Sequence, residues 1–90
     1  MKREDVLNKG KAILHATKSI KNNHISEQIG LFQQTLRIKL EDRFIDGRVN
    51  DIKLFKEGIE MTGSKLNKEL KKNIIEYCDM SIEFYENKED

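Results

Sequence analysis

Proline is absent from the 90 residues, and cysteine occurs once, at Cys78. Proline interrupts helices because it lacks a backbone N–H and its ring clashes with the preceding turn, so its absence permits helix along the whole chain. A single cysteine cannot form an intramolecular disulfide, which excludes a small scaffold held together by bridges. We therefore expect the packing of apolar side chains to stabilise this protein.

The sequence also lacks a long apolar run and an excess of either charge. Charged residues begin at the second position of the chain, and no uninterrupted apolar stretch follows. We therefore predict neither a signal peptide nor a membrane span, and we expect a cytoplasmic location. The 17 Lys and Arg residues against 16 Asp and Glu give a net charge of +1. This charge supplies little of the long-range field of a dedicated nucleic-acid-binding protein, and it favours another protein as the partner.

Apolar residues recur at intervals of three and four, which predicts helices at about residues 3–21, 25–45 and 64–87, with another between Asn50 and Gly63. Short connections favour antiparallel neighbours. The sequence therefore predicts an all-α fold: a small antiparallel bundle of four helices, the third one short, in a single domain spanning residues 1–90. A three-helix arrangement with a kink is the alternative.

The helix boundaries are predicted from glycine and from capping residues. Glycine adopts positive φ without a Cβ clash, so Asp46-Gly47 is expected to end the second helix. Asn50 is expected to cap the third helix, with Val49 packed onto Leu54 in a hydrophobic staple. The dipeptide at residues 63–64, Gly-Ser, is expected to end that helix and cap the fourth.

The two ends of the chain carry opposite charge. Residues 1–25 hold six basic and two acidic side chains, whereas residues 73–90 hold one basic and six acidic side chains. In an antiparallel bundle these ends lie side by side, and they could also meet between two chains in a homodimer. The basic side chains expected to face acidic ones are Lys2, Arg3, Lys9 and Lys11, opposite Glu76, Asp79, Glu83 and Glu86.

His15 begins a His-x-x-Lys-Ser fragment that includes Lys18. The fragment resembles the phosphorylated-histidine motif of histidine phosphotransfer domains, which are also helical bundles. That resemblance implies an exposed imidazole with Lys18 attracting the phosphoryl oxygens. Only 14 residues precede His15, whereas the family has another helix there, and Ser19 replaces the usual glycine. A surface histidine between charged neighbours is the alternative interpretation.

A lysine-rich stretch follows the Gly-Ser dipeptide and superficially looks like the second helix of a helix-turn-helix. Its lysines could contact phosphates and give a DNA-binding regulator. No side chains suited to reading base edges follow, and the helix continues into acidic sequence, so a solvated lysine face is the ordinary explanation. The lysines concerned are Lys65, Lys68, Lys71 and Lys72.

Residues suited to catalysis or metal binding are sparse. The two histidines lack the i, i+4 relation of a helical metal site, and Cys78 is far from both. No glycine-rich phosphate loop, nucleophile motif or carboxylate pair is evident, so we predict no enzyme, no cofactor and no metal. Cys78 itself fits a small buried apolar position.

Three aromatic residues near the C-terminus, Tyr77, Phe84 and Tyr85, are followed by acidic sequence. Aromatic anchors beside charge suit a protein interface, and a core position is the equal alternative. Small size and balanced charge favour a non-enzymatic protein-binding module, such as an inhibitor, an immunity-like or antitoxin-like partner or a regulatory subunit. The Lys, Ile and Asn bias is typical of AT-rich coding sequence, including that of phages and mobile elements.

Overall fold

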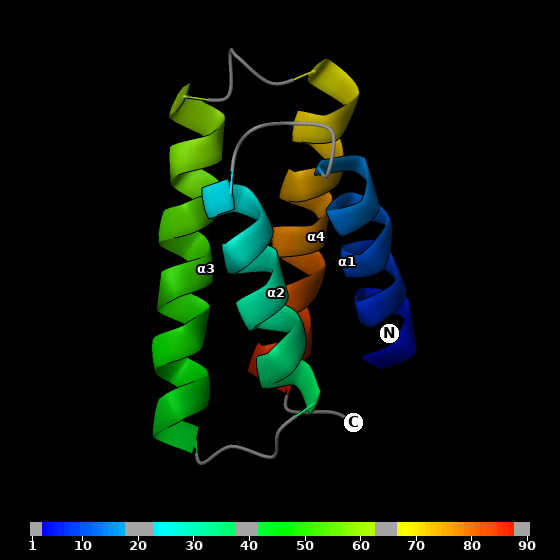
Figure 1. Ribbon diagram of the computed structural model, residues 1–90. Coiled ribbons are helices and arrows are strands. Elements are labelled where there is room, and N and C mark those ends of the chain that lie inside the picture. The colour runs from blue at the N-terminus through cyan, green and yellow to red at the C-terminus, as the bar shows by residue number, and fades with distance from the viewer. Residues whose placement is uncertain (1–2, 18–22, 38–41, 63–66, 88–90) are drawn as a thin grey trace.

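The computed structural model describes residues 3–17, 23–37, 42–62 and 67–87. Within these ranges the chain forms four helices, α1 (Arg3–Thr17), α2 (Asn23–Arg37), α3 (Asp42–Thr62) and α4 (Lys68–Asn87). Figure 1 shows them side by side, with successive helices running in opposite directions. The prediction of a small, all-α antiparallel four-helix bundle is therefore confirmed.

The boundary between the second and third helices lies earlier than predicted. α2 ends at Arg37 and α3 begins at Asp42, so the prediction of a helix over residues 25–45 that stops at Asp46-Gly47 is wrong. Gly47 lies inside α3. Packing of the α3 inner face outweighs the roughly 1 kcal/mol that an interior glycine costs relative to alanine.

The predicted cap and staple of the third helix are wrong for the same reason. Asn50 lies inside α3, which has 21 residues and is not short. Val49 is buried in the core while Leu54 is 67% exposed, so the two side chains lie on different faces of the helix.

The fourth helix begins later than predicted. The backbone N–H of Glu69 donates to Asn67 Oδ1 at 2.8 Å, and that of Leu70 donates to the same oxygen at 3.4 Å. Asn67 is therefore the N-cap of α4, since a side-chain oxygen that accepts from the first turn satisfies N–H groups lacking a helical partner. The predicted stop and cap, Gly63 and Ser64, lie outside the described residues.

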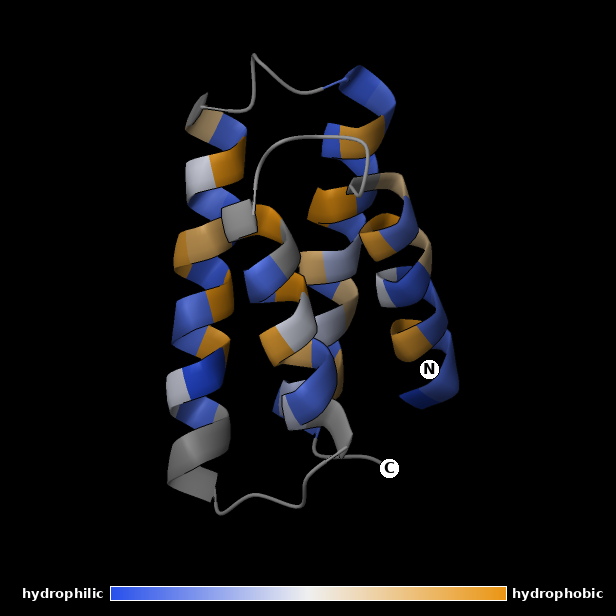
Figure 2. Cartoon of the chain, in the orientation of Figure 1, coloured by the Kyte–Doolittle hydropathy of each residue, from blue (hydrophilic) through white to orange (hydrophobic). Residues whose placement is uncertain are grey.

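The core takes apolar side chains from every helix (Figure 2). Phe32 lies at its centre, with its ring centroid 5.7 Å from that of Phe55 and 6.4 Å from that of Tyr77. The Tyr85 hydroxyl donates to the Phe32 carbonyl oxygen at 2.9 Å and joins α4 to α2. Fully buried apolar side chains are Val6, Ile29, Phe32, Ile52, Ile74, Tyr77 and Cys78.

α1 packs tightly against its neighbours because Gly10 lacks a side chain. A Cβ at Gly10 would lie 2.8 Å from Gln33 Nε2 and 3.0 Å from Tyr77 Cε1. The buried Gln33 amide uses this space to donate to the Leu7 carbonyl oxygen at 3.0 Å. None of the described helices is both long enough and apolar enough to cross a membrane.

Candidate protein-binding face

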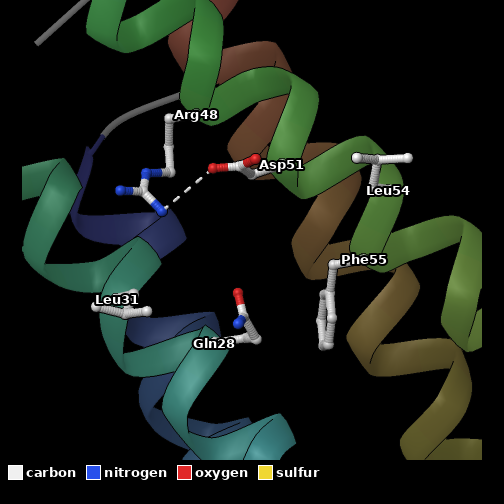
Figure 3. A pocket seen from close by; sticks show the side chains of 6 residues that line it. All are labelled: Gln28, Leu31, Arg48, Asp51, Leu54 and Phe55. Atoms are coloured by element: carbon white, nitrogen blue, oxygen red, sulfur yellow. Dashed lines mark ion pairs between the residues drawn. The ribbon is translucent and has the colours of Figure 1, made fainter.

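An open groove of about 420 Å³ separates α2 from α3. Among the described residues, the backbones of α3 and α4, of α1 and α4, and of α1 and α2 form the close helix pairs, and α2 and α3 are not one of them. Figure 3 shows the two helices contributing side chains from opposite sides of the groove. The groove is lined by Gln28 and Leu31 of α2 and by Arg48, Asp51, Leu54 and Phe55 of α3.

The large apolar side chains that are exposed in the described residues gather on this side of the bundle. Leu31 is 43% exposed, Leu54 is 67% exposed and Met61 is 79% exposed. Leu31 and Leu54 line the groove, and Met61 follows Leu54 by two helical turns on the same side of α3. We call the groove-lining residues together with Met61 the α2–α3 face.

Five residues on the outward side of α3 are separated alternately by four and three positions. Gly47, Asp51, Leu54, Gly58 and Met61 follow one another at these intervals, which places them along one line of the helix. Among the described residues, a Cβ at Gly47 or Gly58 would meet nothing within 4 Å, so a methyl group fits at either position.

The charges of the α2–α3 face are few and balanced. Arg48 Nη1 lies 3.7 Å from Asp51 Oδ2, one turn further along α3, and both side chains are partly exposed. Exposed pairs of this kind contribute only about 0–1 kcal/mol to stability. The face thus combines apolar side chains with one weakly paired charge of each sign.

The structure confirms one contact predicted between the basic first helix and the acidic fourth. Lys9 Nζ lies 3.0 Å from Glu76 Oε2 and also donates to Asn73 Oδ1 at 3.0 Å. The hydrogen bond and the charge of Lys9 lower the pKa of Glu76 below its ordinary value. Of the other residues proposed for this contact, Lys2 lies outside the described residues, Arg3 is half-buried, and Lys11 and Glu83 are exposed.

Two acidic residues of α4 pair with α3. Asp79 Oδ1 lies 2.7 Å from Lys56 Nζ, and Glu86 Oε1 lies 3.3 Å from Lys53 Nζ. The hydrogen bond that Lys56 Nζ donates to Asp79 raises the pKa of Lys56. The prediction that these carboxylates face the first helix is wrong. The sequence indicates which helices are neighbours, but it does not show which face of α4 each carboxylate occupies.

Burial of the C-terminal aromatic residues agrees with the core interpretation. Tyr77 is fully buried, Tyr85 is 4% exposed and Phe84 is 8% exposed. Little of these side chains is left for contact with a partner, so the α2–α3 face takes their place as the candidate site.

The residues of the two alternative functions occupy other parts of the surface. His15 is exposed near the end of α1, and Lys18 lies outside the described residues. On α4, Lys68 and Lys72 are exposed, whereas Lys71 Nζ donates to the Glu60 carbonyl oxygen at 3.4 Å. Lys65 lies outside the described residues. Phosphotransfer and DNA binding therefore stay predictions.

The described residues contain no group of His, Cys, Asp and Glu side chains suited to a metal ion. Burial raises the pKa of the Cys78 thiol to about 12. The thiol is therefore protonated at neutral pH, whereas a nucleophilic cysteine requires a thiolate.

No family model matches this chain, and no match is found among curated proteins or solved structures.

The exposed residues of α3 were missed by the sequence-based prediction. Placing a helix stop at Gly47 divided the four-and-three repeat between two elements, and Leu54 was assigned to a staple. The signal that could have revealed them is the recurrence of glycine and large apolar residues at helical spacing between Gly47 and Met61.

Proposed function

We propose that this chain is a small, non-enzymatic protein-binding module and that the α2–α3 face is its binding surface. The gathering of Leu31, Leu54 and Met61 on one side of the bundle supports the proposal most strongly. Single exposed apolar residues are common in folded proteins, but a group of them beside a groove is typical of an interaction site.

The chemistry of the α2–α3 face suits a protein interface. Covering a side chain such as Leu54 or Met61 gains about 1.5–3 kcal/mol relative to leaving it in water. Gln28, Arg48 and Asp51 add polar groups to the lining of the groove, and known interfaces combine apolar contacts with hydrogen bonds. Leu54 lies beside the groove and Met61 extends the contact along α3, so we expect both to contribute to binding.

The module acts by occupying the surface of another protein molecule, in the cytoplasm, as an inhibitor, an immunity-like or antitoxin-like partner or a regulatory subunit. Its size, its balanced charge and its lack of recognisable catalytic motifs support this class. The Lys, Ile and Asn bias supports an origin in a phage or mobile element.

Photo-cross-linking in cells tests this surface directly. A photoreactive amino acid replaces Leu54 in one variant and Asn8, an exposed residue of α1, in a matched control. We expect irradiation to give protein adducts at position 54 and few at position 8, read by denaturing gel and mass spectrometry. An absence of adducts at position 54, or equal yields at both positions, contradicts the proposal.

A further inference from the structure

We infer that the α2–α3 face binds a second copy of this chain, with α3 packed against α3 across a two-fold axis. The inference rests on the proposed function and names the partner of that surface. It depends on the shape, spacing and charge of the face and on the area that a dimer requires.

The shape of the face is self-complementary. A two-fold interface uses the same patch on both subunits, so the patch must contain both the projecting groups and the space that receives them. Leu54 and Met61 project from α3 with 67% and 79% of their surface exposed. The groove of about 420 Å³ between α2 and α3 lies directly beside Leu54. One copy can therefore place its leucine in the groove of the other.

The four-and-three spacing of α3 matches helix-on-helix packing. Residues repeated in this way form the contact line of paired helices, and small residues on that line let two backbones approach closely. Gly47 and Gly58 lie on the line with open space where a Cβ would be. Each glycine costs about 1 kcal/mol relative to alanine in a helix interior. Glycine at these two positions leaves room for a second helix to approach the α3 backbone closely.

The contact line is about 21 Å long between Gly47 and Met61, since a helix rises 1.5 Å per residue. A partner must present a helix of matching length with a matching repeat, and α3 itself, with 21 residues, meets both requirements.

The charge of the face also suits a second copy. Arg48 and Asp51 give the face one charge of each sign, and their separation of 3.7 Å is long for an ion pair. A copy of the same face carries both signs, and a two-fold axis makes each contact occur twice.

The size of the molecule sets the area available. A stable interface buries about 800 Å² on each partner, and the principal extents of the chain are 35 × 23 × 20 Å. An interface of that area covers about an eighth of the 6183 Å² accessible surface of the chain, which one broad side can supply. The line from Gly47 to Met61 together with Leu31 on α2 spans such a side, whereas a contact at the groove alone covers only part of it.

Sedimentation velocity on the purified chain over a range of concentrations tests the inference. We expect a species of twice the 10.6 kDa chain mass for the wild type. Leu54→Glu should raise the dimer dissociation constant at least roughly tenfold, as for loss of a central interface residue, while Asn8→Glu, with the same charge change, should leave it unaltered. Circular dichroism checks that both variants are folded.

Disulfide cross-linking provides a second readout. Leu54→Cys places a thiol near the proposed axis, and the native Cys78 is buried and does not compete. Oxidation should give a covalent dimer with Leu54→Cys and none with Asn8→Cys.

The outcomes separate this inference from the proposed function. A wild type that stays monomeric, or a dimer that Leu54→Glu leaves intact, overturns the second copy as the occupant. If a monomeric wild type nevertheless gives photo-adducts at position 54 with a different protein, the binding face stands and only the partner changes. If position 54 gives no adduct with a second copy of the chain and none with a different protein, both proposals fail.

Discussion

Glycine serves opposite purposes on two sides of this bundle. Where α1 meets α2 and α4, a Cβ at Gly10 would lie 2.8 Å from Gln33 Nε2, so glycine is required for the helices to fit together. On the outward side of α3, a Cβ at Gly58 would meet nothing within 4 Å. The packing of one chain explains the first glycine, whereas a Cβ at the second would lie in open space among the described residues.

Polar groups differ between the same two sides. Next to α1, Gln33 and Lys9 bridge to neighbouring helices through hydrogen bonds of 3.0 Å. On the α2–α3 face, Arg48 and Asp51 form a longer contact within α3 alone, beside exposed leucines. The comparison teaches that polar groups on the α1 side link neighbouring helices, while the α2–α3 side leaves large apolar side chains exposed.

Truncation of a large side chain should change the free energy of unfolding much more in the core than on the α2–α3 face. Phe32→Ala removes the ring at the centre of the core and should lower the free energy of unfolding by about 3–5 kcal/mol. Leu54→Ala, at an exposed position, should change it by less than about 0.5 kcal/mol in the monomer. Urea denaturation at low protein concentration measures both. Similar losses in the two variants would show that the α2–α3 side is as completely packed as the core.

Alkaline pH should destabilise the protein through groups buried in the core. Burial raises the pKa of Cys78 from 9.0 to about 12 and also raises those of Tyr77 and Tyr85. Between the unfolded and folded pKa values the unfolded chain holds fewer protons, so stability is retained below pH 9 and falls as the pH rises.

The thiol contribution can be isolated with Cys78→Ala. Each group titrating only in the unfolded state contributes a slope of about 1.4 kcal/mol per pH unit, and the variant should remove one such slope between pH 9 and 12. Urea denaturation at several pH values measures it. An unchanged slope in Cys78→Ala would mean that the thiol ionises equally in both states.

Alanine at the two kinds of glycine should shift stability in opposite directions. Gly10→Ala forces a methyl group into Gln33 and Tyr77 and should destabilise by about 1–3 kcal/mol. Gly58→Ala adds a methyl group in open space and should stabilise the monomer by about 0.5–1 kcal/mol, because it improves helix propensity. Thermal unfolding of dilute protein measures both changes. The same sign for both would remove the contrast on which the α3 argument depends.

The smallest expected effect concerns the ion pair between α1 and α4. Lys9 lowers the pKa of Glu76, so its stabilising effect is present above the unfolded pKa and is lost as the pH falls through the folded value. Lys9→Met should return the Glu76 pKa toward its ordinary value, as followed by NMR titration of the side-chain carboxyl. A Glu76 pKa that is the same in both proteins would mean that the pair does not persist in solution.

The sequence alone was sufficient to predict the helical class and the contact of Lys9 with Glu76. Three-and-four periodicity predicts helices wherever an apolar face exists, and the opposite charges of the two chain ends follow from antiparallel packing. These features depend on spacing and sign, which can be read without knowing how each helix is rotated.

The start of α3 and the binding face required the structure. Gly47 has the local chemistry of a helix stop, but the structure shows that α3 continues through it. Val49 and Ile52, which follow Gly47, are buried on the inner face of the same helix. The role of Tyr85 depends on a carbonyl 53 residues away, at Phe32. Contacts at such separations leave no local pattern, so interface and core were equally acceptable interpretations for the aromatic residues.

Methyl NMR spectra of the wild-type chain over a dilution series test the central claim most directly, since they report on both sides of the bundle in one sample. The account predicts that the methyl signals of Leu31, Leu54 and Met61 shift or broaden with concentration, while those of Ile13 and Ile74 in the core do not. Concentration-dependent changes confined to α1 and α4, or none at any methyl group, would contradict it.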